Sequence, residues 1–189
     1  MKLNLGSGYN KPEGYISVDA NPACQPDVVH DCDKFPWPWP DNSVTEVVFH
    51  HSLEHMGQET RVFLRLMQEL YRVCKDGALI TITVPHPRHD QFMHDPTHVR
   101  IITPVGLSMF DAEMNRMWIK QRASNTTLAL YLGVDFWISA VVAVVDDLYK
   151  NDVSSGWLTT ERLEIFSKER NNVISEYQIT MHCRKPAIP

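Results

Sequence analysis

The sequence lacks several features that would mark particular classes of protein. Its four cysteines form no C-x-x-C pair and no regular framework, which argues against a disulfide scaffold and predicts reduced thiols. It has no run of basic residues and a net charge of −5, which disfavours nucleic acid as a partner because phosphate contacts dominate such binding. The beginning of the chain has no apolar signal-like segment. These absences predict a cytoplasmic protein.

Long hydrophobic runs are also missing. The most apolar stretch, WISAVVAVV at 137–145, has nine residues, whereas a membrane-spanning helix needs about twenty. We therefore expect no membrane span. A chain of 189 residues with 43% hydrophobic and 22% charged residues can bury a sizeable core, and it shows no repeat and no low-complexity tract. We expect one domain over residues 1–189.

What the sequence does contain is a series of short apolar runs, each followed by turn-forming or acidic residues. The candidate strands are residues 3–5, 15–18, 27–31, 45–51 and 78–85. Residues 58–77 instead carry apolar side chains at helical spacing and end in Lys75-Asp76-Gly77, a typical C-terminal stop. Because the last of these strands is apolar on both faces, the pattern favours an α/β fold with a mostly parallel sheet.

The first connection of this sheet is unusual. Six residues separate Gly8 from Tyr15, whereas a crossover between parallel strands normally takes a dozen or more. The expected fold is therefore a Rossmann-like, mostly parallel sheet in which the first crossover helix is missing or minimal.

Residues with binding chemistry follow the ends of the predicted strands. In chain order they are Gly6, Ser7 and Gly8, then Asp19, then Asp31, then His50 and His51. The carboxyl ends of parallel strands meet in one crevice, so we expect these residues to share a site. A glycine pair lets a ligand approach the backbone, and carboxylates suit a ribose diol and an adenine amino group. The pattern predicts a site for an adenosine-bearing ligand.

Five segments between residues 2 and 87 resemble, in this order, the class I S-adenosylmethionine-dependent methyltransferases. They are LNLGSG, GYISVDANP, DVVHDCDKFPWPWPDNSVTEV, HHSLEH and LYRVCKDGALITITVP. More narrowly, the segments resemble the small bacterial proteins of that superfamily that begin almost directly with the first strand. The resemblance implies S-adenosyl-L-methionine as the cofactor and S-adenosyl-L-homocysteine as the product. It also implies a cofactor-binding half, 1–87, and a substrate-pocket half, 88–189.

The resemblance also implies individual cofactor contacts. They are Gly6, Ser7 and Gly8 at the methionine part, Asp19 at the ribose hydroxyls, Ala20 or Asn21 beside the adenine, Asp31 and Cys32 at the adenine amino group and edge, and His51 near the sulfonium. Two positions depart from the usual pattern: Asn4 stands in place of an acid, and Asn10 in place of a third glycine. The proline-rich segment FPWPWP, 35–40, is expected to be a rigid loop covering the adenine side, with a polyproline ligand as the alternative.

Four histidines and two aspartates gather in PHPRHDQFMHDPTH, residues 85–98. A metal site is one interpretation, but the spacing follows no recognised ligand signature, so we predict no metal. Similar methyltransferases carry DPTH followed by an Arg and TP at this point, which implies a loop over the acceptor pocket. The substrate-binding residues implied are His86, Asp95, His98 and Arg100. A purely structural pairing of Asp95 with His98 remains an alternative.

The second half is expected to contain helical insertions and two further strands. A helix beginning near Pro104 is predicted within 103–118, and another at 159–172, with a Thr start and a Glu164–Lys168 pair. Residues 133–147 and 173–185 are predicted strands, and the resembling fold makes the last strand antiparallel. The apolar stretch 134–145 is either a core strand or the face of a homodimer.

Together these features predict transfer of a methyl group to an O, N or C atom of a small-molecule or sugar-like acceptor. For a hydroxyl acceptor, the candidate general bases are His98, His51 and His55. The alternative is a non-catalytic protein of the same fold that acts as a binding or interaction module. A nicotinamide dehydrogenase is disfavoured, because Lys11 occupies the third glycine position of G-x-G-x-x-G and no helix follows. A metal hydrolase built on the histidine cluster is a further alternative.

Overall fold

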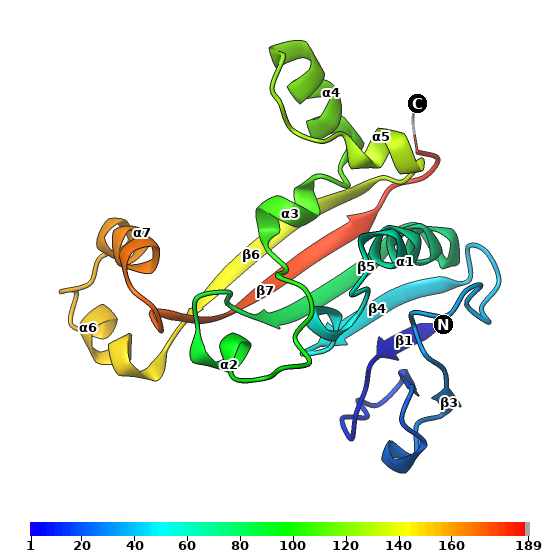
Figure 1. The fold of residues 1–189 in the computed structure, drawn as a ribbon, viewed down its shortest axis with the longest axis horizontal. Helices are drawn as coiled ribbons and strands as arrows, with labels where there is room; N and C mark the ends of the chain where they lie inside the picture. Colours follow the sequence, from blue (N-terminus) through cyan, green and yellow to red (C-terminus); the bar gives the residue numbers. More distant parts are fainter. Residues whose placement is uncertain (188–189) are drawn as a thin grey trace.

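The computed structural model describes residues 1–187, and a single seven-stranded sheet runs through it (Figure 1). The strands lie in the order β3-β2-β1-β4-β5-β7-β6. Their bounds are β1 Lys2–Leu5, β2 Ile16–Asp19, β3 Val28–Val29, β4 Val44–His50, β5 Cys74–Pro85, β6 Phe136–Val145 and β7 Ile174–Cys183. Neighbouring strands are parallel except where β7 pairs with β5 and β6. The predicted mostly parallel sheet with an antiparallel last strand is confirmed.

Among the described residues, α-helices occur only after β4. They are α1 Thr60–Val73, α2 Asp90–Met93, α3 Pro104–Ser108, α4 Ala112–Gln121, α5 Leu128–Leu132, α6 Lys150–Ser154 and α7 Thr160–Glu169. Short 3-10 turns add η1 Pro22–Cys24, η2 Leu53–His55 and η3 Asp147–Tyr149. The connection from β1 to β2 has no helix, as predicted. Instead the N–H of Ser7 donates to the carbonyl of Val18 at 2.9 Å, and the Asn4 amide donates to the carbonyl of Asn10 at 2.8 Å.

The end of α1 differs from the sequence prediction. The helix stops at Val73 instead of near Gly77, and β5 begins at the next residue, Cys74. The N–H groups of Asn42 and Ser43 bind the carbonyls of Arg72 and Val73, at 3.0 and 2.9 Å, so a neighbouring loop satisfies the end of the helix. Gly77, at φ +72°, instead lies where the register between β4 and β5 shifts.

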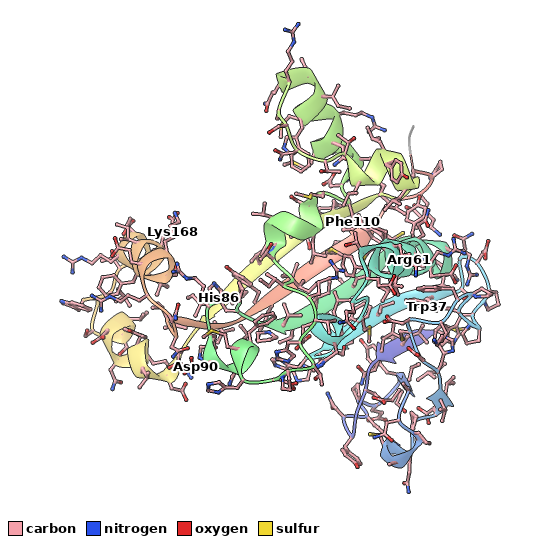
Figure 2. The ribbon with its side chains drawn as sticks, in the orientation of Figure 1. Trp37, Arg61, His86, Asp90, Phe110 and Lys168 are labelled. Carbon is pink, nitrogen blue, oxygen red and sulfur yellow. The ribbon has the colours of Figure 1, made fainter. Side chains whose placement is uncertain are left out.

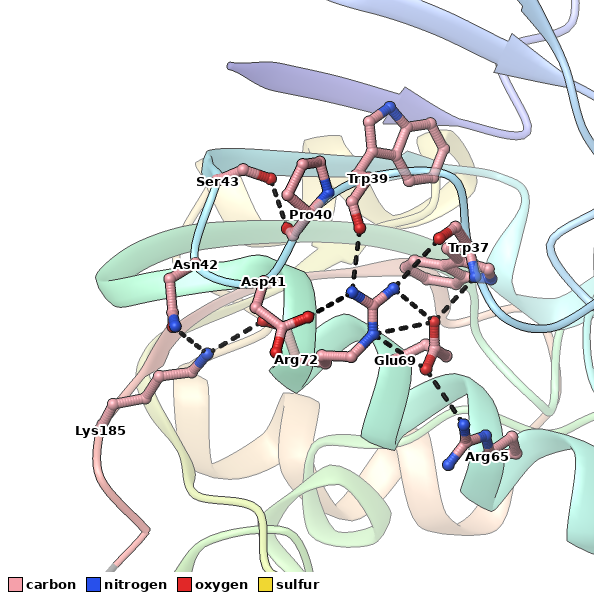
Figure 3. A network of polar contacts seen from close by, with 10 residues as sticks. All are labelled: Trp37, Trp39, Pro40, Asp41, Asn42, Ser43, Arg65, Glu69, Arg72 and Lys185. Carbon is pink, nitrogen blue, oxygen red and sulfur yellow. Dashed lines mark hydrogen bonds and ion pairs between the residues drawn. The ribbon is translucent and has the colours of Figure 1, made fainter.

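The proline-rich loop packs against α1 (Figure 3). Trp37 and Trp39 are buried, and the Arg72 guanidinium donates to both of their carbonyls, at 3.1 and 2.9 Å. Arg72 also pairs with Glu69 at 2.7 Å, and Glu69 accepts the N–H of Trp37 at 2.8 Å. The Glu69 side chain is buried although it is acidic. Although burial raises the pKa of its carboxyl, the bonds from Arg72 and Trp37 hold that pKa below its usual value.

Two helical arms leave the sheet from opposite ends of β6 (Figure 1). One arm is α4 with α5, and the other is α6 with α7, where Lys168 is labelled in Figure 2. The helix predicted within 103–118 is in fact two, because the Asp111 carboxylate accepts the N–H groups of Glu113 and Met114 and begins a new helix. The helix predicted at 159–172 is confirmed as α7, with its Glu164–Lys168 ion pair at 2.7 Å.

Candidate cofactor and acceptor site

A pocket of about 380 Å³ lies beyond the carboxyl ends of β1, β2, β3 and β4. We call it the first pocket. Its lining residues are Gly6, Gly8, Asp19, Ala20, His30, Asp31, Cys32, Asp33, His51, Ser52, His55 and Met56. Seven of the nine residues expected around a cofactor therefore lie on its wall. The other two, Ser7 and Asn21, do not line it.

The turn after β1 owes its shape to Gly6 and Gly8. Both have a positive backbone φ, +67° and +51°, which residues other than glycine rarely adopt. A Cβ on Gly6 would lie 2.5 Å from the Cβ of Ser52, whose hydroxyl donates to the carbonyl of Leu5 at 2.7 Å. The backbone of this turn therefore lies directly against the segment after β4, and only glycine fits between them.

Two carboxylates hold turns that line the first pocket. Asp19 accepts the N–H of Gly8 at 2.7 Å and that of Asn21 at 2.8 Å, and Asp31 accepts the N–H of Asp33 at 2.9 Å. A carboxylate has about four acceptor positions, so both side chains keep capacity for a ligand in the pocket. Beside them, burial raises the pKa of the Cys32 thiol to about 12, so this side chain is neutral at physiological pH.

A second pocket, of about 400 Å³, adjoins the first and shares His51 and His55 with it. Its lining residues are His51, Glu54, His55, Pro85, Gln91, Asp95, His98 and Glu176. Two backbone hydrogen bonds hold the segment after β5 against the turn after β4. The N–H groups of Val99 and Arg100 both donate to the carbonyl of Glu54, at 2.9 and 3.1 Å. The structure thus brings Asp95 and His98 next to the two histidines that follow β4.

His51 lies at the junction of the two pockets with a backbone φ of +49°, a strained conformation for a residue with a side chain. Its Nδ1 lies 3.7 Å from Glu54 Oε1 and its Nε2 lies 3.1 Å from Glu176 Oε2. The interaction with Glu54, aided by Glu176, raises the pKa of His51 above its usual value despite the opposing effect of burial. This environment favours the imidazolium form.

The proton positions of His98 and His55 follow from their partners. His98 Nδ1 lies 2.9 Å from the carbonyl of Phe92, which can only accept, so Nδ1 carries the proton. Thr97 Oγ1 gives its single proton to Asp95 at 2.6 Å and must accept from His55 Nδ1 at 2.9 Å. In the neutral rings, Nε2 of both histidines therefore carries a lone pair.

Other members of the histidine-rich segment lie elsewhere. His86 accepts the N–H of Arg88 at Nδ1 and is buried beside Tyr177, and burial lowers its pKa (Figure 2). His89 binds Asp146. Arg100 donates to the carbonyl of Gly57 at 2.6 Å and lines a separate, mainly apolar cavity of about 180 Å³. Of the four residues expected to bind substrate, only Asp95 and His98 line the second pocket.

The sequence did not predict several of the residues that line the two pockets. They are His30, Asp33, Ser52, Met56, Gln91 and Glu176. The carboxylate of Asp33 accepts the N–H of Gly57 at 2.9 and 3.1 Å, and burial raises the pKa of Asp33. The position of Asp33, two residues after Asp31, could have identified it from the sequence as a residue of the first pocket. Glu176 offered no such signal, because only the pairing of β7 with β5 brings it to the site.

No protein-family model matches the chain, and no curated protein matches its sequence. Solved structures do match. An S-adenosylmethionine-dependent methyltransferase from Archaeoglobus fulgidus is 22% identical, with a TM-score of 0.62 over 96% of this chain and 85% of that one. One from Methanosarcina mazei is 14% identical, with a TM-score of 0.53 over 96% and 91%. The [4+2]-cyclase SpnF is 15% identical, with a TM-score of 0.54 over 96% and 74%.

At these identities the similarity establishes the fold. The chain has the class I S-adenosylmethionine-dependent methyltransferase fold, as its sequence motifs predicted. No helix in the described part of the chain is both long and apolar enough to cross a membrane.

Proposed function

We propose that the protein is an S-adenosylmethionine-dependent methyltransferase that modifies a small-molecule or sugar-like acceptor in the cytoplasm. The observation that carries the proposal is the convergence of Gly6, Gly8, Asp19 and Asp31 on the first pocket. These residues come from three separate strand ends, and each has the chemistry that an adenosine-bearing ligand needs. Many solved structures that match the chain are methyltransferases by name.

The residues of the first pocket fit this cofactor. The turn at Gly6, Ser7 and Gly8 would hold its methionine part, and Asp19 would accept hydrogen bonds from the ribose hydroxyls. Such charge-assisted bonds contribute about 1.5–3 kcal/mol each. Ala20, Asn21, Asp31 and the backbone of Cys32 would surround the adenine, and His51 would lie near the sulfonium. Bound S-adenosyl-L-methionine supplies an activated methyl group, and S-adenosyl-L-homocysteine is what remains after transfer.

The second pocket would hold the acceptor, because it adjoins the first at His51 and His55. Orientation of the two reactants could then supply about 7–11 kcal/mol of barrier lowering. For a hydroxyl acceptor, His98 has the best arrangement to receive the proton, since its Nε2 lone pair is fixed by the bond at Nδ1. His55 is the next candidate. His51 is the weakest of the three bases, because its two carboxylate neighbours favour its charged form.

A non-catalytic binding role is the second candidate. Asn4 replaces the acid of the usual first motif, and the first crossover helix is absent. The named cyclase among the matching structures shows that proteins of this fold are not all named as methyltransferases. A protein that binds the cofactor without turnover would belong to this second class.

The first test is calorimetry with S-adenosyl-L-homocysteine on the unaltered protein, on Asp19→Asn, and on Glu13→Gln as an exposed acid of the same β1–β2 connection. We expect micromolar binding that is weakened at least tenfold by Asp19→Asn and unchanged by Glu13→Gln. Absence of binding to the unaltered protein would refute the proposed cofactor. Binding without transfer to any acceptor in a broad screen would favour the non-catalytic role.

A further inference from the structure

Glu54 has an unusual environment for a carboxylate. Its side chain is 1% exposed, and both of its oxygens are buried without a hydrogen-bond partner. A buried charge without hydrogen bonds costs several kcal/mol, so a buried carboxylate is ordinarily paired with a cation. The groups that face it are imidazoles: His51 Nδ1 at 3.7 Å and His98 Nε2 at 4.0 Å from Oε1.

Glu54, His55 and His98 form a set of potential metal ligands. One donor atom from each of the three lies within 4.8 Å of the others. The rings of His55 and His98 meet edge to face, with centroids 4.6 Å apart. Two histidines and one carboxylate, with further positions open, are a recurrent ligand set for zinc and for non-haem iron.

The outer contacts of the two histidines match those of metal ligands. A ligating histidine usually donates its other N–H to a carbonyl or a carboxylate, which orients the ring. His98 donates from Nδ1 to the carbonyl of Phe92, and His55 donates from Nδ1 to Thr97, which in turn donates to Asp95. Both Nε2 lone pairs are thereby left for an ion, and Thr97 and Asp95 of the DPTH sequence are the outer partners of His55.

We propose that Glu54, His55 and His98 bind a divalent first-row transition-metal ion, such as Zn²⁺, on the wall of the second pocket. The ion would neutralise the buried carboxylate and keep open coordination positions toward the acceptor. The histidine-rich segment 85–98 contributes only one ligand. The other two come from the turn after β4, which is why spacing within the segment did not reveal the site.

The use of this ion rests on the proposed function. A metal-bound hydroxyl loses its proton more readily, because the cation stabilises the oxyanion. In methyl transfer the acceptor oxygen forms the bond to the methyl carbon, the carbon–sulfur bond breaks, and its electron pair stays on sulfur. The acceptor proton passes to solvent. The role of His98 then changes from general base to ligand, and no separate base is needed.

The test uses the full chain without a histidine tag, stripped with a chelator and titrated with Zn²⁺ by calorimetry and with Co²⁺ by visible absorption. We expect one ion per chain, with a Co²⁺ spectrum typical of nitrogen and oxygen ligands. Glu54→Gln and His98→Gln should each weaken binding at least tenfold. His94→Gln, which changes an exposed histidine of the same segment outside the ligand set, should leave binding unchanged.

Two outcomes would overturn the inference: no ion bound by the unaltered protein, or equal affinity in the unaltered protein and in His98→Gln. His98→Gln decides the matter if Glu54→Gln does not fold, and thermal unfolding of the stripped variants checks their folding. Calorimetry with S-adenosyl-L-homocysteine on the same samples separates the two proposals. Cofactor binding without metal binding refutes the metal site alone, and the converse refutes the cofactor proposal alone.

Discussion

Nε2 of His89 lies 3.0 Å from Oδ2 of Asp146, and this contact fastens the segment after β5 to the end of β6, 57 residues further along the chain. His89 Nδ1 accepts the N–H of Gln91, so Nε2 is the protonated nitrogen that donates to the carboxylate. Hydrogen bonds from the N–H of Leu148 and from His89 hold the pKa of Asp146 below its usual value. The contact therefore holds the segment that carries Asp95 and His98.

This contact predicts a particular pH dependence for Asp146→Asn. A lowered folded-state pKa means that the stabilisation is present above the pKa of the unfolded state, near 4, and is lost as the pH falls through the folded-state value. We expect the variant to be less stable by about 1 kcal/mol at pH 7 and pH 5. The difference should close toward pH 3. Urea unfolding at the three pH values measures it, and a constant difference down to pH 3 would contradict it.

Gly6→Ala should be more destabilising than Gly8→Ala. Both substitutions force a side chain into a left-handed conformation, which costs about 1–2 kcal/mol. A new Cβ at position 6 also lies 2.5 Å from the Ser52 Cβ, whereas at position 8 nothing lies within 4 Å. Overpacking typically adds about 1–3 kcal/mol. Denaturant unfolding of the pair isolates this contact, and equal losses would show that the two segments can move apart.

Arg72→Met should destabilise the fold strongly. It leaves the buried Glu69 carboxylate without its closest cation and removes the bonds to the carbonyls of Trp37 and Trp39 (Figure 3). Breaking a buried pair from one side costs about 3–5 kcal/mol. Arg65→Met is the matched control, because Arg65 reaches the same carboxylate from a half-exposed position at 3.3 Å, and its loss should cost under about 1 kcal/mol. Urea unfolding compares the two, and similar losses would refute this account of the loop.

The exposed apolar residues of the edge strand β6 predict a homodimer. This strand pairs only with β7 in the described structure, and residues 140–143 are exposed although they are all apolar, with Val141 at 44% and Val142 at 53%. A second copy pairing along this edge would cover them symmetrically. We expect a dimer in sedimentation experiments, a monomer for Val142→Lys, and no change for Val105→Lys, an exposed valine on α3. A monomeric unaltered protein would refute the dimer.

The elements predictable from the sequence were those with a local cause. Alternating or continuous apolar runs mark the strands, and the residues after each strand point to the first pocket because parallel strands end at one edge. The predicted end of α1 was wrong because a tertiary contact determines where the helix stops. Local signals favour continuation to Gly77, but Cys74 pairs with Val44 and begins the next strand.

The second pocket could not be derived in the same way. Glu54 reads as an ordinary acid in a first helical turn, and nothing local shows that it is buried among histidines. Glu176 lies opposite Pro85 in the register of β5 with β7, and only that antiparallel pairing brings it to His51. The sequence gives no local signal for this contact, because His51 and Glu176 are 125 residues apart in the chain.

The position of β7 has a consequence for biosynthesis. This strand follows the other six described strands in chain order but lies inside the sheet, between the twelve-residue β5 and the ten-residue β6. A nascent chain that has not yet reached residues 174–183 exposes the edge of β5 and holds β6 without a neighbour. Pairing between segments so distant in sequence is slow, and unpaired edges promote aggregation. We therefore expect the partly synthesised chain to be prone to aggregation until β7 pairs with β5 and β6.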